Sequence, residues 1–240
     1  MILITNILFD LDGTLLPLDM DEFLKKYFYE LGLKFKDHFS ADELTAYIWK
    51  ATAYMIKNTE ATKTNSVAFF EEFYRQVGID EEIVTPIFEE FYQLDFDKIK
   101  STSRQSKLMI DAVNILKTKG YNLIVATNPL FPQVAIHKRI QWAGLDPADF
   151  SFITSFEEMH YCKPQLQFYR EILENIKQPP EKCMMVGNDI EEDMIAKKIG
   201  ITTYLIEDCL VDKDKPYDNI DYKGRYEDFY LFALSMPELN

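Results

Sequence analysis

Five short runs of apolar residues, separated by longer amphipathic stretches, limit the folds open to this chain of 240 residues. The runs lie at 2–9, 121–126, 152–154, 183–186 and 203–206. Runs of this kind are typical of strands that are buried on both faces of a parallel sheet. Stretches of helical length precede or separate the later runs, at 104–119, 132–143, 165–177 and 190–199. The alternation predicts an α/β fold, with a Rossmann-like doubly wound parallel sheet as its core.

The segment from about residue 19 to 97 interrupts this alternation, because it shows helical patterns and no convincing strand. Helices are predicted at 19–31, 40–58, 65–77 and 80–94, and Ser40 with Glu43 forms a capping box. Aromatic residues are dense in this segment, and most of them would form the core of a small helical bundle, with a few left to line a cleft. We therefore expect an all-helical domain at 18–97, inserted into an α/β core formed by 1–17 and 98–240.

The charge and the cysteines narrow the range of partners and compartments. A formal net charge of -14 argues against nucleic acid or an anionic membrane as a partner. Cys162, Cys183 and Cys209 are odd in number and form no CxxC pair, which indicates reduced thiols. The apolar N-terminal run is too short for a membrane span and has no basic leader. We expect a cytoplasmic protein, a monomer or weak homodimer. The overall negative charge means that any anionic substrate would need a metal or local cations at its binding site.

The first apolar run is followed directly by the sequence DLDGT at 10–14. Asp10 and Asp12 stand two residues apart at an extended strand end, so their carboxylates point the same way and need a cation, a shared proton or different roles. Gly13 permits a sharp turn that exposes backbone N–H groups to an anion. The alternative is an ordinary strand-ending turn, since Asp and Gly are common turn residues.

Polar residues also follow three of the later runs. Thr127 and Asn128 offer a hydroxyl and a backbone N–H that suit a phosphoryl oxygen. Lys163 precedes Pro164, which suits the first position of a helix. The acid-rich segment GNDIEED at 187–193 offers oxygen ligands of the kind that Mg²⁺ prefers. Each feature alone has an ordinary explanation as a cap or a solvated charge, but the carboxyl ends of parallel strands share one edge of a sheet, so together they predict one site.

These four clusters, in this order, resemble the four motifs of the haloacid dehalogenase superfamily. The resemblance covers essentially the whole chain, and the helical segment at 18–97 looks like the C1-type cap of that superfamily. It implies a Mg²⁺-dependent phosphatase that acts on a small phosphorylated metabolite.

The resemblance also assigns roles to individual residues. Asp10 would attack phosphorus and form an aspartyl-phosphate, while Asp12 would serve as general acid and then as general base. Thr127 and Lys163 would hold the transferring oxygens. The residues expected to bind the phosphate are Leu11, Asp12, Thr14, Thr127, Asn128 and Lys163, in part through backbone N–H groups.

The fourth motif leaves two alternatives for the Mg²⁺ ligands that would act beside Asp10 and the backbone carbonyl of Asp12. If the motif is aligned strictly, Asn188 occupies the position of the ligand acid. If it is aligned by chemistry, Asp189 is the ligand and Asp193 has an orienting role. We favour Asp189 and Asp193, with Asn188 close to the metal.

Other functions are compatible with parts of this pattern. A phosphosugar mutase of the β-phosphoglucomutase type shares both acids and the cap, but protects the phosphoaspartate from water. Dehalogenases of the 2-haloacid type work without Mg²⁺ and have no acid at the position of Asp12, so Asp12 favours phosphate esters. A non-catalytic binding module is disfavoured, because every acid, Thr and Lys position is filled. The substrate cannot be read from the sequence, and the basic loop at 57–65 is either a substrate contact or, as we prefer, a solvated loop.

Overall fold

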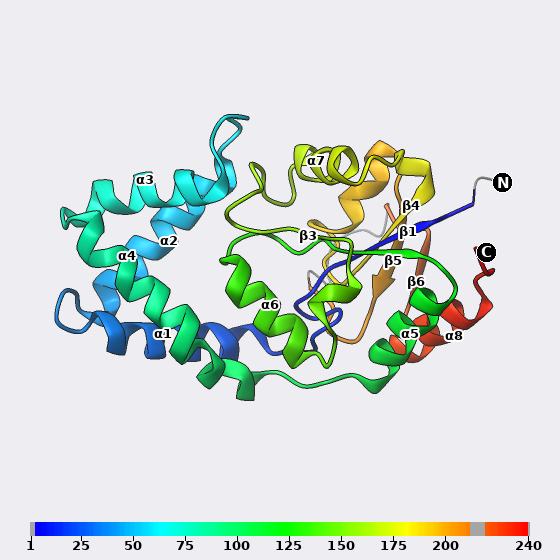
Figure 1. Cartoon of the computed structure of the whole chain (residues 1–240), viewed down its shortest axis with the longest axis horizontal. Helices are drawn as coiled ribbons and strands as arrows, with labels where there is room; N and C mark the ends of the chain where they lie inside the picture. Colours follow the sequence, from blue (N-terminus) through cyan, green and yellow to red (C-terminus); the bar gives the residue numbers. More distant parts are fainter. Residues whose placement is uncertain (1–2, 212–218, 240) are drawn as a thin grey trace.

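The computed structural model describes residues 3–211 and 219–239, and within them six strands form one parallel sheet (Figure 1). The strand order is β3-β2-β1-β4-β5-β6. The strands are β1 (Asn6–Phe9), β2 (Asn122–Val125), β3 (Phe152–Ile153), β4 (Cys183–Gly187), β5 (Thr202–Ile206) and β6 (Tyr222–Gly224). Every neighbouring pair is parallel, so the predicted Rossmann-like α/β core is confirmed.

Helices cover both faces of the sheet, which explains why its central strand β1 is apolar at Ile7, Leu8 and Phe9. These helices are α5 (Lys107–Thr118), α6 (Gln133–Trp142), α7 (Leu166–Ile176) and α8 (Tyr226–Ser235). Ile7 and Phe9 of β1 belong to the hydrophobic cluster that includes α5 and α8, whereas Leu8 belongs to the cluster that includes α7. Successive residues of β1 therefore face opposite layers, as the twofold repeat of a strand requires.

Two local predictions about the core were wrong. Residues 190–199 do not form an α-helix, because the chain first makes a turn and then a 3₁₀ helix at Met194–Ile199. Pro164 does not begin a helix either, since α7 starts at Leu166 and the Lys163–Pro164 peptide is cis. The strand β6 was not predicted, and the helix α8 follows it.

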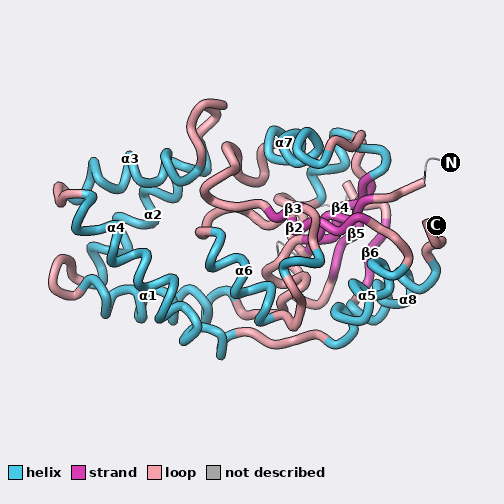
Figure 2. Tube along the Cα trace, viewed as in Figure 1, coloured by secondary structure: helices cyan, strands magenta, loops and turns pink. Residues whose placement is uncertain are grey.

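The four helices predicted between residues 19 and 94 are all present and lie to one side of the sheet (Figure 2). They are α1 (Met20–Phe35), α2 (Ala41–Lys57), α3 (Asn65–Val77) and α4 (Glu81–Glu90), and α4 continues through a π-helical turn into a 3₁₀ helix at Phe96–Thr102. The capping box of Ser40 and Glu43 is also present. Aromatic rings fill the space between these helices, with Phe88 at 4.8 Å from Phe35 and 5.5 Å from Phe73 between ring centroids.

The end of α2 and the start of α3 connect the helical bundle to the core. Backbone N–H groups of Asn65 and Ser66 donate to the carbonyls of Met159 and Phe156, at 2.7 and 2.9 Å. Gln165 donates from its side chain to the carbonyls of residues 56 and 58. Within the described residues, no helix has both the length and the apolar character needed to cross a membrane.

Candidate active site

The predicted clusters after β1, β2 and β4 meet at one edge of the sheet. Phe9 pairs in register with Val125 on one side and with Val186 on the other, so the chain leaves the three strands at the same level. Asp10 follows β1 directly, and Thr127 follows β2 after one intervening residue. This edge is the carboxyl end of a parallel sheet, where ligands of open α/β folds bind.

Lys163 lies between two acids of different motifs. Its Nζ donates to Asp10 Oδ1 at 2.8 Å and to Asp193 Oδ1 at 2.6 Å, and the residue is 1% exposed. Burial alone would lower the pKa of Lys163, but the two carboxylates raise this pKa well above its ordinary value, so the side chain is an ammonium. Burial raises the pKa of Asp10 and of Asp193, an effect that Lys163 opposes. The lysine thus reduces the repulsion between the clustered acids.

Asn128 joins three of the motifs through one side chain. Its Oδ1 accepts the backbone N–H of Lys163 at 3.2 Å, and its Nδ2 donates to both carboxyl oxygens of Glu192 at 3.1 Å. The neighbouring Thr127 is buried, and its carbonyl accepts the hydroxyl of Thr154 at 2.7 Å. These bonds hold the segment after β2 against the segments before α7 and after β4.

The acids of the fourth motif have different contacts. Asp193 pairs with Lys163 through Oδ1, and its Oδ2 accepts the backbone N–H of Asp189 at 3.0 Å. Asp189 Oδ1 in turn accepts the backbone N–H groups of Glu191 and Glu192, each at 2.8 Å. These bonds hold the turn that precedes the 3₁₀ helix at Met194–Ile199.

Asn188 contacts the loop that follows β1. Its Oδ1 accepts the hydroxyl of Thr14 at 2.9 Å, and its Nδ2 donates to the carbonyl of Cys209 at 2.7 Å. A Cβ on Gly13 would lie 2.3 Å from that Nδ2, and Gly13 has a φ of +84°. Glycine is therefore required at residue 13 both for the turn and for the close approach of Asn188.

Most of the predicted site residues line one cleft between the sheet edge and the helices α1 to α4. Those that line it are Asp10, Asp12, Thr127, Asn128, Asn188, Asp189 and Asp193. Leu11, Thr14 and Lys163 lie behind this surface and are almost fully buried. The predicted roles of all these residues in catalysis, phosphate binding and metal binding stay predictions.

Arg139 on α6 is a charged residue of this site that the sequence prediction missed. Its guanidinium pairs with Asp12 Oδ2, its side chain is 1% exposed, and it stacks over the ring of Phe131 at 4.6 Å. The other oxygen, Asp12 Oδ1, is buried without a hydrogen-bond partner in the described residues. Helical periodicity in the sequence could have pointed to Arg139. It follows the buried Ala135 by four residues and so lies on the buried face of α6, where a charged side chain needs a partner.

A comparison with known families identifies the group to which these motifs belong. The model of the haloacid dehalogenase-like hydrolases matches residues 4–200. The chain belongs to the haloacid dehalogenase-like hydrolases. This match confirms the family assignment from the four motifs, and with it the prediction that the chain is a hydrolase.

Individual relatives of this hydrolase are distant in sequence. Pyrophosphatase PpaX from Anoxybacillus flavithermus is 22% identical over 200 residues, which cover 83% of this chain and 82% of PpaX. The HAD phosphatase from Thermococcus onnurineus superposes with a TM-score of 0.61 at 18% identity, over 98% of this chain and 100% of that one. The HAD-hydrolase YfnB from Bacillus subtilis, in a structure bound to magnesium, superposes with a TM-score of 0.58 at 17% identity, over 97% of this chain and 99% of YfnB. The two solved structures support the fold alone.

The oxygen atoms at the carboxyl edge of the sheet fit Mg²⁺. The candidates are the carboxylate of Asp10, the backbone carbonyl of Asp12, and the side chains of Asn188 and Asp189, which all line the cleft. Within the described residues, no three His, Cys, Asp or Glu side chains converge as a metal cluster. A site of this composition suits Mg²⁺, which often takes only one or two carboxylates and completes its shell with water and phosphate.

Glu192 of this hydrolase also lines the cleft and gives a testable pH effect. Burial raises its pKa to about 7, although Lys163 opposes the shift. Its stabilising contribution is therefore complete below the ordinary pKa of 4.5 and is lost as the pH rises through about 7. Glu192→Gln removes this pH dependence. On going from pH 5 to pH 8, the unfolding free energy of the variant should therefore rise by about 2 kcal/mol relative to that of the wild type. Urea denaturation with EDTA at both pH values measures this, and a constant difference would contradict it.

Proposed function

We propose that this hydrolase is a magnesium-dependent phosphatase that hydrolyses a small phosphorylated metabolite through an aspartyl-phosphate on Asp10. The observation that carries the proposal is the contact between Asp10 and Lys163 at the carboxyl edge of the sheet, with Asp12 and Thr127 lining the same cleft. Phosphoryl transfer needs a positioned nucleophile and positive charge near the transferring oxygens, and these residues supply both. The names of the relatives, a pyrophosphatase and a phosphatase, agree with phosphate chemistry.

In the proposed reaction, a carboxylate oxygen of Asp10 attacks phosphorus as the bond from phosphorus to the alcohol oxygen breaks. Asp12 gives its proton to the leaving alcohol, then accepts a proton from the water that attacks the aspartyl-phosphate, and inorganic phosphate leaves. Lys163, Thr127 and backbone N–H groups of residues 11, 12 and 128 stabilise the charge on the transferring oxygens. Thr14 would support this loop through Asn188.

The two oxygens of Asp12 have different surroundings, which suggests different tasks. Oδ2 is held by Arg139, whereas Oδ1 has no hydrogen-bond partner in the described residues. We assign proton transfer to Oδ1 and propose that Arg139 is a positioning residue that fixes the direction of the carboxyl group.

The metal is proposed to bind Asp10, the backbone carbonyl of Asp12, and an oxygen of Asp189 or Asn188. When bound, Mg²⁺ neutralises charge on the phosphate and on the acids around it. Asp193, which pairs with Lys163, would orient that lysine. The free thiols support the proposed cytoplasmic location. We also propose that residues 18–97 form a cap domain, and that 1–17 with 98–240 form the catalytic core.

A screen of phosphorylated metabolites tests the proposed function. The purified protein should release inorganic phosphate from at least one ester in the presence of Mg²⁺. With EDTA in place of Mg²⁺, the rate should fall by at least about 100-fold, because the acids at the site then repel the substrate. Folding is checked by circular dichroism in both conditions. A folded protein that hydrolyses no ester, or one that works equally well in EDTA, would contradict the proposal.

A further inference from the structure

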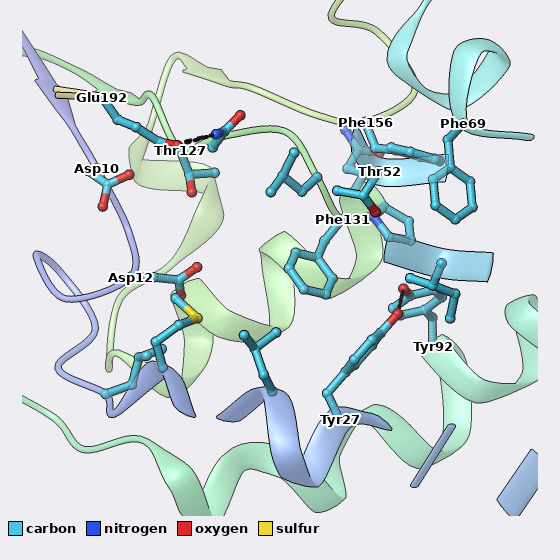
Figure 3. Close-up of a pocket in the computed structure, with 18 of the residues that line it drawn as sticks. Asp10, Asp12, Tyr27, Thr52, Phe69, Tyr92, Thr127, Phe131, Phe156 and Glu192 are labelled. Carbon is cyan, nitrogen blue, oxygen red and sulfur yellow. Dashed lines mark hydrogen bonds between the residues drawn. The ribbon is translucent and has the colours of Figure 1, made fainter. Parts of the chain in front are cut away.

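The cleft that contains the carboxylates extends far beyond them. Its volume is about 1190 Å³, and it runs from the sheet edge to the inner surface of the helices α1 to α4. Figure 3 shows Asp10, Asp12, Thr127 and Glu192 at one end, and rings that include those of Tyr27 and Phe131 at the other. We propose that this second end binds an uncharged apolar group, of the size of an aromatic ring, on the alcohol part of the phosphate ester. The inference rests on the proposed phosphatase function and adds its substrate class.

The walls at this end are made of rings from both parts of the molecule. The principal ones belong to Tyr27, Phe69, Phe70, Tyr92, Phe131 and Phe156. Tyr27 of α1 packs edge-on against Phe131 of the core at 5.4 Å, and Phe69 of α3 packs against Phe156 at 5.7 Å. A surface built in this way favours apolar and aromatic groups, which pack edge-to-face against such rings.

The hydroxyl groups among these rings are neutral. The hydroxyls of Tyr27 and Tyr92 bond to each other at 2.8 Å. Burial raises the pKa of Tyr27 to about 12, and burial also raises that of Tyr92 well above its usual value, so both side chains are phenols at neutral pH. Thr52 of α2 also lines the cleft, at the same end as these rings (Figure 3). These groups do not attract an anion.

Cations that could hold a second anionic group are scarce in the described part of the cleft. Arg104 is the one cationic side chain among the described lining residues, and its backbone is bonded to Pro17 of the loop that leads into α1. Acidic side chains also line the cleft, among them Glu89 and Glu157. A carboxylate or second phosphate on the substrate would therefore be repelled and left without a partner.

The basic loop at 57–65 does not supply the missing charge. None of its residues lines the cleft. Lys63 instead pairs with Glu71 at 2.9 Å and with Glu60 at 3.5 Å. The interpretation of this loop as a substrate contact is therefore not supported, and among the described lining residues Arg104 is the one cationic side chain that could pair with the second phosphate of a mutase's bisphosphate.

A cation is the other group that aromatic rings attract. Glu89 and Glu157 would also attract a cation, whereas the aliphatic side chains of Leu24, Ile48 and Val134, which line the same cleft, favour an uncharged group. The trimethylammonio compound in the experiment below shows whether this end of the cleft prefers a cation.

Four propyl phosphates test the inference: propyl phosphate itself, and its 3-phenyl, 3-carboxy and 3-trimethylammonio derivatives. All four release a primary alcohol, so differences in kcat/KM report binding at the far end of the cleft. We expect kcat/KM for 3-phenylpropyl phosphate to exceed that for propyl phosphate by about 30-fold, and the carboxy compound to fall about 10-fold below propyl phosphate.

Thr52→Lys places a cation beside the rings and should change this order. The ratio of kcat/KM for the carboxy compound to that for the phenyl compound should rise at least about 10-fold. Ala53→Lys is the matched control, since Ala53 is exposed on the same helix and does not line the cleft. It should leave the ratio unchanged.

The outcomes separate the two proposals. Equal kcat/KM for the phenyl and propyl compounds, or a preference for the carboxy or trimethylammonio compound, would overturn the apolar substrate class and leave the phosphatase intact. The same holds if the protein hydrolyses other esters but not the phenyl compound. Hydrolysis of none of the four, with none in the metabolite screen, would overturn both.

Discussion

Replacement of Asp10 by Asn is expected to reduce phosphate release by at least about 10³-fold, whichever ester the wild-type protein hydrolyses. The amide has nearly the shape of the carboxylate but is too weak a nucleophile to form the phosphorylated intermediate. The fold should be retained, because Lys163 keeps its bond to Asp193 and the Asn oxygen can still accept from Nζ. Phosphate assays give the rate, and acid-quenched reactions with labelled substrate show whether a phosphoprotein forms.

An Asp→Asn change on the surface serves as the control for this variant. Asp42 is exposed in the first turn of α2, and Asp42→Asn should leave both the rate and the phosphoprotein signal as in the wild type. If Asp10→Asn still releases phosphate at a comparable rate, the nucleophile is another group, and the assignment of Asp10 is wrong. If the protein is a non-catalytic binding module, the wild type itself should release no phosphate.

The central sheet was predictable because its strands are buried on both faces. Leu8 faces one helical layer while Ile7 and Phe9 face the other, so these three positions of β1 are apolar, and the buried Asn6 at the start of the strand is bonded to Asn122. The edge strand β6 does not have this constraint. Its Tyr222 and Lys223 are exposed, and the strand pairs only with β5, so its sequence carries no apolar run.

The position of the candidate site was predictable for a related reason, since strand ends are local features and a parallel sheet gathers them at one edge. The contact of Asp12 with Arg139 joins residues that are 127 positions apart, and no local pattern reports such a pair. In the sequence, Arg139 follows a histidine and a lysine and resembles a solvated basic patch. Which rings of the helical bundle face the cleft likewise depends on how α1 to α4 pack beside the core, which only the tertiary structure defines.

Replacement of Lys163 by Met is expected to remove activity and stability together. The variant leaves Asp10 and Asp193 close to each other in a buried position without the cation that both contact. Removal of one member of a buried ion pair costs about 3–5 kcal/mol, because the remaining charge is uncompensated. Burial already raises the pKa of both acids, and Lys163 no longer opposes this in the variant. The protonated forms of the two acids contribute stability that is lost as the pH rises. The decrease in unfolding free energy relative to the wild type should therefore be larger at pH 8 than at pH 5.

Denaturation curves at the two pH values and phosphate assays measure these effects, and two further variants separate their causes. Lys107→Met removes a lysine whose side chain is 85% exposed and paired with Asp111, and it should change stability by no more than about 0.5 kcal/mol. Lys163→Met combined with Asp193→Asn should recover part of the lost stability but no activity, because the transferring oxygens still lack their ammonium. Wild-type stability in Lys163→Met would mean that the two acids are neutral in the fold. Retained phosphate release would mean that the charge on the transferring oxygens is stabilised without Lys163, since no other part of the proposed mechanism requires that side chain.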